Sequence, residues 1–269
     1  MTPAAFAAFL DALATRLAAE PAVLGLVATG SAAGLSHAPD AWSDHDFWVI
    51  AAPGAAEALR ARHDWLPDLD RVVLAFRETA HGVKVLYGDG HLLEYAVFEP
   101  HELDGAKVND YRILLDRADL AARLADVRAA TRRWSAGAYT DDLWLFGQVL
   151  TLAQIAAGRH ARGERLSAHA YLEGHALDLL VRLLARHLVP DRPDRFDDID
   201  PRRRFEEVFP AAAAHLTAAL AAPLPETARR FVALAEEVAA PVLGPWTARA
   251  ADAVRARIAE AERALAAAC

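Results

Sequence analysis

The pattern of apolar residues changes near Asp116, and this change constrains the fold more than any other feature of the chain. Before this point, short apolar runs alternate with turn residues, which is typical of β-strands. After it, apolar residues recur almost only at helical spacing. We therefore predict an α+β protein with a mixed β-sheet and helices in residues 1–130 and an all-helical bundle in residues 131–269.

Capping and turn residues set the expected bounds of these elements. Thr2-Pro3 is suited to begin a helix, because threonine caps helix N-termini and proline fits the first turn. Gly88-Asp89-Gly90 predicts a hairpin turn. The strands are expected at 23–29, 47–51, 71–76, 82–87 and 91–98, with a small-residue loop at 30–42. The helices are expected at 2–20, 55–64, 118–133, 141–159, 164–188, 210–222, 225–243 and 245–268.

Composition excludes several classes of protein. No apolar run in the 269 residues approaches the ~20 that a membrane span needs, and Met1-Thr2-Pro3 lacks the basic start of a secretory signal. The single cysteine, Cys269, cannot form an internal disulfide, so we expect a cytoplasmic protein. A formal net charge of -8 disfavours nucleic acid as a partner and suits a cationic small substrate.

Two carboxylates stand at the start of the second expected strand. Asp44 and Asp46 are two residues apart, so both side chains project to the same side of a strand. Phe47 and Val49 then point the other way, into a core. Adjacent anionic oxygens are the ligands that Mg²⁺ prefers, so the pair is a candidate metal site.

Gly30-Ser31 follows the first expected strand directly. Glycine lets the backbone approach a ligand closely, and Ser31 offers a hydroxyl and an N–H group. Backbone N–H groups at a turn or at the start of a helix suit a phosphate. A phosphate cradle and a paired-carboxylate metal site, joined by one loop, form the two halves of a nucleotidyl-transfer site.

The order of these motifs resembles the nucleotidyltransferase superfamily that includes aminoglycoside and lincosamide adenylyltransferases. The segments Ala28–Ser31 and Asp40–Phe47 carry the resemblance, because the family has Gly-Ser, a loop, and Asp-x-Asp on the next strand, often after Trp-Ser. The segment Tyr111–Arg117 also looks like the one that closes the catalytic domain in streptomycin-type relatives. The resemblance implies a nucleotidyltransferase domain in residues 1–130 and a helical domain in 131–269 for acceptor binding or dimerisation.

The resemblance also implies roles for particular residues. Two Mg²⁺ ions would be the cofactors, and ATP or another NTP the co-substrate. The third acid, Glu94, stands where relatives more often have Asp, and it is either a metal ligand or the general base. Ala32 and Ala33 stand where relatives often have Arg. The implied catalytic and metal-binding residues are Asp44, Asp46 and Glu94, and the implied nucleotide-binding residues are Gly30, Ser31 and Ser43.

The implied reaction moves a nucleoside monophosphate from the NTP to a hydroxyl of a small molecule. An aminoglycoside-like antibiotic is the first acceptor to consider, which would make the chain an antibiotic-resistance enzyme, and a homodimer is compatible with the helical half. A protein-modifying nucleotidyltransferase, an antitoxin-like regulatory protein and a non-catalytic nucleotide-binding relative are the alternatives. The intact acids argue against the last of these.

Other polar residues have simpler interpretations. His45 is expected to lie on the face opposite the two aspartates and to be structural, and Lys84 to be a solvated strand lysine. In the helical half, Arg182 and His187 fit the Arg-x4-His spacing of HEPN ribonucleases, but the dipole at a helix C-terminus explains them better. Pairs four residues apart, which we interpret as solvated or capping pairs, are His169 with Glu173 and Tyr171 with His175.

Overall fold

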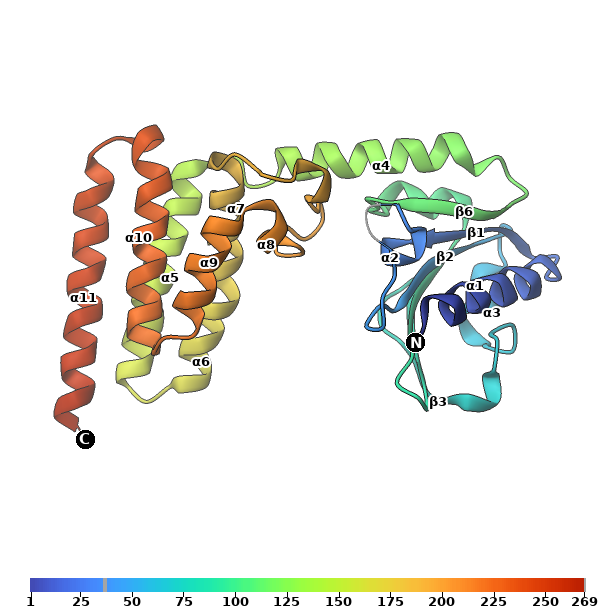
Figure 1. Cartoon of the computed structure of the whole chain (residues 1–269), viewed down its shortest axis with the longest axis horizontal. Helices are drawn as coiled ribbons and strands as arrows, with labels where there is room; N and C mark the ends of the chain where they lie inside the picture. The colour runs from blue at the N-terminus through green and yellow to red at the C-terminus, as the bar shows by residue number, and fades with distance from the viewer. Residues whose placement is uncertain (36–37, 269) are drawn as a thin grey trace. The chain divides into compact units, whose positions relative to one another are not determined.

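The computed structural model describes residues 1–35 and 38–268. It divides into two compact units, Met1–Ser135 and Ala136–Cys269. The first unit contains a mixed β-sheet and the second is built from helices, so the predicted α+β fold class is confirmed (Figure 1). Cys269, on which the disulfide prediction depends, lies outside the described residues, as do Ser36 and His37.

Within the described part of the first unit, six strands form one sheet in the order β3-β4-β5-β2-β1-β6. Neighbouring strands are antiparallel except β2 and β5, which run parallel. The sheet is therefore mixed, as the sequence predicts. The strands are β1 (Val23–Thr29), β2 (His45–Ala51), β3 (Val72–Arg77), β4 (Gly82–Tyr87), β5 (Leu92–Phe98) and β6 (Tyr111–Asp116).

The strands differ most from the sequence prediction at β2 and β6, whereas β3 and β5 each begin one residue later than predicted. β2 begins at His45 rather than at residue 47, because the polar His45 is fully buried and pairs with β5 like an apolar residue. β6 is not among the predicted strands, since only three apolar residues, Ile113 to Leu115, stand between polar ones. It forms because β1 offers it a pairing edge, with Ala28 opposite Arg112.

Helices cover both faces of the sheet. On one face lie α1 (Pro3–Ala18) and α3 (Ala56–Ala61), whose apolar side chains pack with those of the central strands. Thr2 begins α1 as predicted, since its hydroxyl accepts a hydrogen bond from the Ala5 N–H at 3.2 Å. On the other face, α4 (Leu120–Gly137) packs against Val27 and its neighbours.

The second unit is a bundle with its own apolar core (Figure 1). Its helix α5 packs against α7, α10 and α11. The single helix expected at 164–188 is interrupted by a π-helical segment, Ala170–Ala176. The helices are α5 (Asp142–Ala161), α6 (Arg165–His169), α7 (Leu177–His187), α8 (Phe205–Val208), α9 (Pro210–Leu220), α10 (Leu224–Leu243) and α11 (Trp246–Ala268).

Short elements complete the chain. A helical turn, α2 (Gly30–Ala33), begins the predicted loop at 30–42, and short 3₁₀ turns lie at Leu69–Arg71, Pro100–Gly105 and Pro193–Arg195. The predicted hairpin turn is confirmed, because the Tyr87 N–H donates a hydrogen bond to the His91 carbonyl at 2.9 Å and Gly90 has φ +85°. Over the described residues, every helix is too short or too polar to cross a membrane.

Candidate active site

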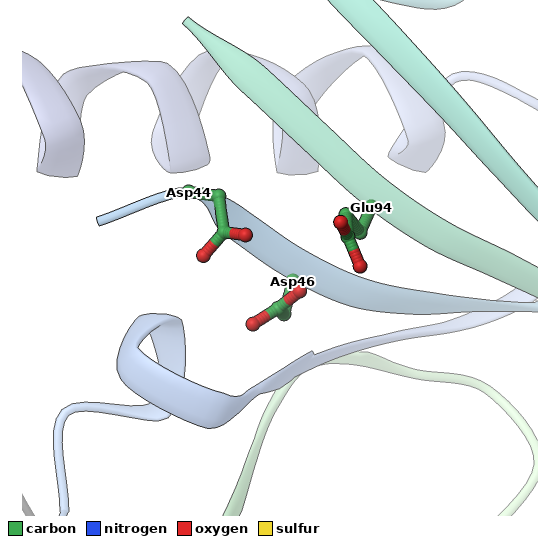
Figure 2. A group of neighbouring side chains, drawn as sticks. All are labelled: Asp44, Asp46 and Glu94. Carbon is green, nitrogen blue, oxygen red and sulfur yellow. The ribbon is translucent and has the colours of Figure 1, made fainter. Parts of the chain in front are cut away.

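The two aspartates of the sequence motif and Glu94 come together at the start of β2. Asp44 directly precedes the strand, Asp46 is its second residue, and Asp46 lies opposite Glu94 in the parallel β2–β5 register. One carboxylate oxygen from each residue lies within 4.8 Å of the other two. Figure 2 shows the side chains of Asp44 and Asp46 beside that of Glu94 on the neighbouring strand.

Strand alternation explains why these carboxylates reach solvent. His45 and Phe47 are fully buried on the α1 face of the sheet, so Asp44 and Asp46 project from the other face, where both are half-buried. The expected orientation of His45 is confirmed. Three half-buried carboxylates are a donor set of hard oxygens, which fits a divalent cation such as Mg²⁺.

Lys84 contacts the third acid. Its ammonium group lies 2.9 Å from Glu94 Oε1 and 2.9 Å from Glu78 Oε1, so the lysine bridges two carboxylates. Because the ammonium donates a hydrogen bond to each of these carboxylates, the pKa of Lys84 is raised. Lys84 is therefore more than a solvated strand lysine: it pairs with Glu94 and would compete with a metal ion for that carboxylate.

Gly30 is fitted tightly against the carboxylates. Its φ is +54°, in the left-handed region that glycine adopts readily. A Cβ atom at this position would lie 2.6 Å from Asp46 Oδ2, which is too close for two unbonded atoms. The backbone at the start of α2 therefore approaches Asp46 so closely that a Cβ at residue 30 would displace the carboxylate or the turn.

Ser31 connects the same turn to the metal-site strand. Its side chain is buried, with 4% exposed, and its hydroxyl donates to the backbone carbonyl of Asp44 at 3.4 Å. This hydrogen bond holds the backbone of Asp44, the residue before β2. A ligand at this turn would therefore meet backbone N–H groups rather than the serine hydroxyl. The nucleotide-binding role of Ser31 stays a prediction.

Ser43 closes a tight turn instead of pointing at the acids. Its hydroxyl donates to Asp40 Oδ1 at 3.1 Å and accepts from the Asp40 N–H at 3.0 Å. The same Asp40 oxygen accepts from the Trp42 N–H at 2.9 Å. Asp40 therefore fixes the backbone immediately before Asp44, and a direct contact of Ser43 with nucleotide stays a prediction.

A pair of histidines, the fully buried His45 and the half-buried His91, lies beside the aspartates. The Phe6 carbonyl can only accept, so His45 Nε2, 3.0 Å away, carries the hydrogen. His45 Nδ1 then accepts from His91 Nε2–H at 2.6 Å. Burial lowers the pKa of His45 to about 4, so the ring is neutral near pH 7. This pair links α1, the strand with the aspartates and the strand with Glu94.

Replacing His91 by phenylalanine is expected to weaken metal binding as well as stability. The change leaves the buried Nδ1 of His45 without its donor, at a cost of about 1–3 kcal/mol, and loosens the segment between Asp44 and Asp46. Mn²⁺ titration and thermal unfolding would measure both effects. His63→Phe is the matched control, because it removes a similar 3.0 Å hydrogen bond to the Tyr95 hydroxyl away from the acids. Equal Mn²⁺ affinity in the two variants would contradict this positioning role.

The polar residues considered in the helical half each contact a specific neighbouring side chain. His169 Nδ1 lies 2.8 Å from Glu173, and the rings of Tyr171 and His175 meet edge to face with centroids 5.6 Å apart. Arg182 pairs with Asp178 at 3.1 Å, and His187 with Asp142 at 2.9 Å. Specific acidic partners, rather than the helix dipole alone, account for Arg182 and His187.

The sequence prediction did not include His91 or the Asp40 turn among the site residues. His91 follows a hairpin glycine and lies 46 residues from its partner, so no local pattern marks the pair. Asp40 does carry a signal: an aspartate followed three residues later by serine is typical of a side-chain-capped turn.

Comparisons with known proteins give a limited result. No family model matches the chain, and no curated protein matches it. Among solved structures, the chain is similar to an aminoglycoside 6-adenyltransferase from Bacillus subtilis, with 10% identity, a TM-score of 0.38, and coverage of 94% of this chain and 97% of that one. It is also similar to the E. coli MS115-1 CdnC:HORMA-deltaN complex, with 17% identity, a TM-score of 0.33, and coverage of 88% and 90%. Neither likeness is close enough to transfer an activity to this chain.

Proposed function

We propose that this protein is a divalent-metal-dependent nucleotidyltransferase. The observation that carries the proposal is the convergence of Asp44, Asp46 and Glu94, with oxygens within 4.8 Å, beside the glycine turn at Gly30. Carboxylates that gather at one strand end repel one another, and a divalent cation bound among them would offset that repulsion. The backbone N–H groups of a turn next to them suit the phosphates of an NTP.

The proposed reaction has one bond-forming and one bond-breaking event. A hydroxyl oxygen of the acceptor forms a bond to the α-phosphorus of the NTP, and the bond from that phosphorus to the β-phosphate bridging oxygen breaks. Pyrophosphate leaves with the electron pair, and the hydroxyl proton passes to a base or to water. The products are the nucleotidylated acceptor and pyrophosphate, with no oxidant or reductant required.

Each residue of the site has a proposed part in this reaction. Asp44 and Asp46 would hold the divalent ions, and Glu94 either shares them or accepts the hydroxyl proton. Gly30 lets the backbone approach the phosphates, and Ser31 fixes the entry to β2. The ions, when bound, would neutralise charge that develops on the triphosphate. Most of the rate enhancement would then come from positioning and charge stabilisation.

The acceptor is proposed to be a small hydroxylated molecule, with an aminoglycoside-like antibiotic as the first to test. An acceptor screen with α-labelled ATP, GTP, CTP and UTP, covering aminoglycosides, lincosamides and proteins, tests this with pyrophosphate release as a second readout. Label transferred to a small molecule, with Mg²⁺ required, is the expected result. Label on a protein would favour the protein-modifying alternative, and binding of NTP without any transfer would favour a non-catalytic relative.

A further inference from the structure

Lys84 lies in the same row of side chains as two of the acids. Residues directly opposite one another on paired strands share a face of the sheet. Lys84 of β4 lies opposite Glu94 of β5, and Glu94 lies opposite Asp46 of β2. The neighbours of Lys84 in its strand, Val83 and Val85, are buried on the α1 face, so Lys84 projects from the other face. The register therefore places one positive charge at the end of a row of acids.

The ammonium group of Lys84 stands where it affects metal binding at the third acid. It lies 2.9 Å from Glu94 Oε1, and only 26% of the lysine side chain is exposed, so water screens this pair less than a surface ion pair. A divalent ion among the three acids must either share Glu94 with the ammonium or displace it. Because two cations at one carboxylate repel each other, displacement is the favoured outcome.

Glu78 gives the displaced ammonium a second carboxylate. Its Oε1 atom lies 2.9 Å from Lys84 Nζ, the same distance as Glu94 Oε1. Glu78 directly follows β3, and Glu94 belongs to β5, so the two carboxylates stand on opposite sides of the strand that carries Lys84. A lysine carries its charge on a flexible stem, so it can leave Glu94 and keep Glu78 as a charged partner.

We propose that Lys84 is a movable internal cation, which pairs with Glu94 in the metal-free protein and shifts to Glu78 when Glu94 binds a divalent ion. The inference rests on the proposed function and adds a positioning residue that is not itself a metal ligand. In the metal-free protein, Lys84 offsets part of the repulsion among the three acids. Its displacement costs free energy, so Lys84 lowers the affinity of the site for the ion and makes Glu94 the last of the three ligands to bind.

The movement can be followed directly because the chain has two lysines, Lys84 and Lys107. Lys107 is exposed, and its ammonium lies 3.2 Å from the centre of the Trp134 ring, so it serves as an internal control. In the full chain labelled with ¹³C at lysine Cε, the Lys107→Met variant assigns the two NMR signals. Saturation with Mg²⁺, followed by calorimetry, should shift the Lys84 signal and leave that of Lys107 in place. A Lys84 signal that stays unchanged at saturation would overturn the inference.

Mn²⁺ affinity distinguishes displacement at Glu94 from general repulsion between the lysine and the ion. Lys84→Met should bind Mn²⁺ about tenfold more tightly than the wild type, and Lys107→Met should bind it equally. If Lys84 acts through Glu94, the gain should nearly vanish when Lys84→Met is combined with Glu94→Gln and compared with Glu94→Gln alone.

Two results of this titration would overturn the inference: an unchanged Mn²⁺ affinity in Lys84→Met, or a tenfold gain that persists without the Glu94 carboxylate. A failure of the proposed function would look different. If neither the wild type nor Lys84→Met bound Mn²⁺ or Mg²⁺, the proposed metal site itself would be refuted, and the inference with it.

Discussion

Replacing Gly30 by alanine is expected to reduce nucleotide transfer by about 100-fold or more. Two effects combine at this position. The left-handed backbone, at φ +54°, costs a residue with a Cβ about 1–2 kcal/mol. The new methyl group would also lie 2.6 Å from Asp46 Oδ2, so the carboxylate or the turn must move. Steady-state transfer rates and Mn²⁺ affinity would both report this displacement.

Gly34 separates the two effects. It also has a left-handed backbone, at φ +68°, but a Cβ there would meet nothing within 4 Å. Gly34→Ala should therefore lose a similar amount of stability and keep nearly all of its transfer rate. If both alanine variants lose activity equally, the close approach of Gly30 to Asp46 is not what the reaction needs.

Replacing Asp46 by asparagine is expected to lower the transfer rate by about 1000-fold while the fold stays intact. The change removes one negative charge from the centre of the acid cluster and keeps the side-chain shape. Because like charges repel, the melting temperature without metal should stay equal or rise. Mn²⁺ affinity should fall in the same variant.

Asp11→Asn is the control for this substitution. Asp11 is an exposed carboxylate on α1, so its replacement changes the net charge of the protein by the same amount at another place. Its transfer rate and Mn²⁺ affinity should remain at the wild-type level. Full activity in Asp46→Asn would refute the assignment of Asp46 as a metal ligand.

The sequence predicts the main parts of the fold because local patterns determine them. Phe6, Leu10, Leu13 and Leu17 repeat at helical spacing and are all buried in α1. The glycines around Asp89 specify the hairpin whatever surrounds it. The strand β6 depends instead on pairing with β1. This contact is long-range, and the short apolar run in β6 does not predict it.

The candidate site likewise has some features that local sequence predicts and others that depend on long-range contacts. The two-residue spacing of Asp44 and Asp46 is enough to place both carboxylates on one side of a strand. That Glu94 lies opposite Asp46 follows from the parallel register of β2 and β5, which local sequence does not encode. The pairing of His45 with His91 is equally long-range, and the roles of these residues in catalysis stay predictions.

The helical half shows where pattern reasoning ends. Amphipathic spacing predicts its helices but not the π-helical segment Ala170–Ala176. The wider π-helical turn changes the spacing of the apolar residues too little to be recognised in the sequence. The acceptor-binding or dimerisation role expected for residues 131–269 stays a prediction.

The central claim is that the acids hold a metal ion that helps to bind an NTP, and thermal unfolding with ATP tests it most directly. With Mg²⁺ and ATP at about 100 times its dissociation constant, ligand binding should stabilise the wild-type protein by about 2.7 kcal/mol, seen as a melting temperature several degrees higher. Without Mg²⁺, or in Asp46→Asn, the shift should largely disappear. If no NTP stabilises the wild type with Mg²⁺ or Mn²⁺, or if ATP stabilises it equally without metal, the account is contradicted.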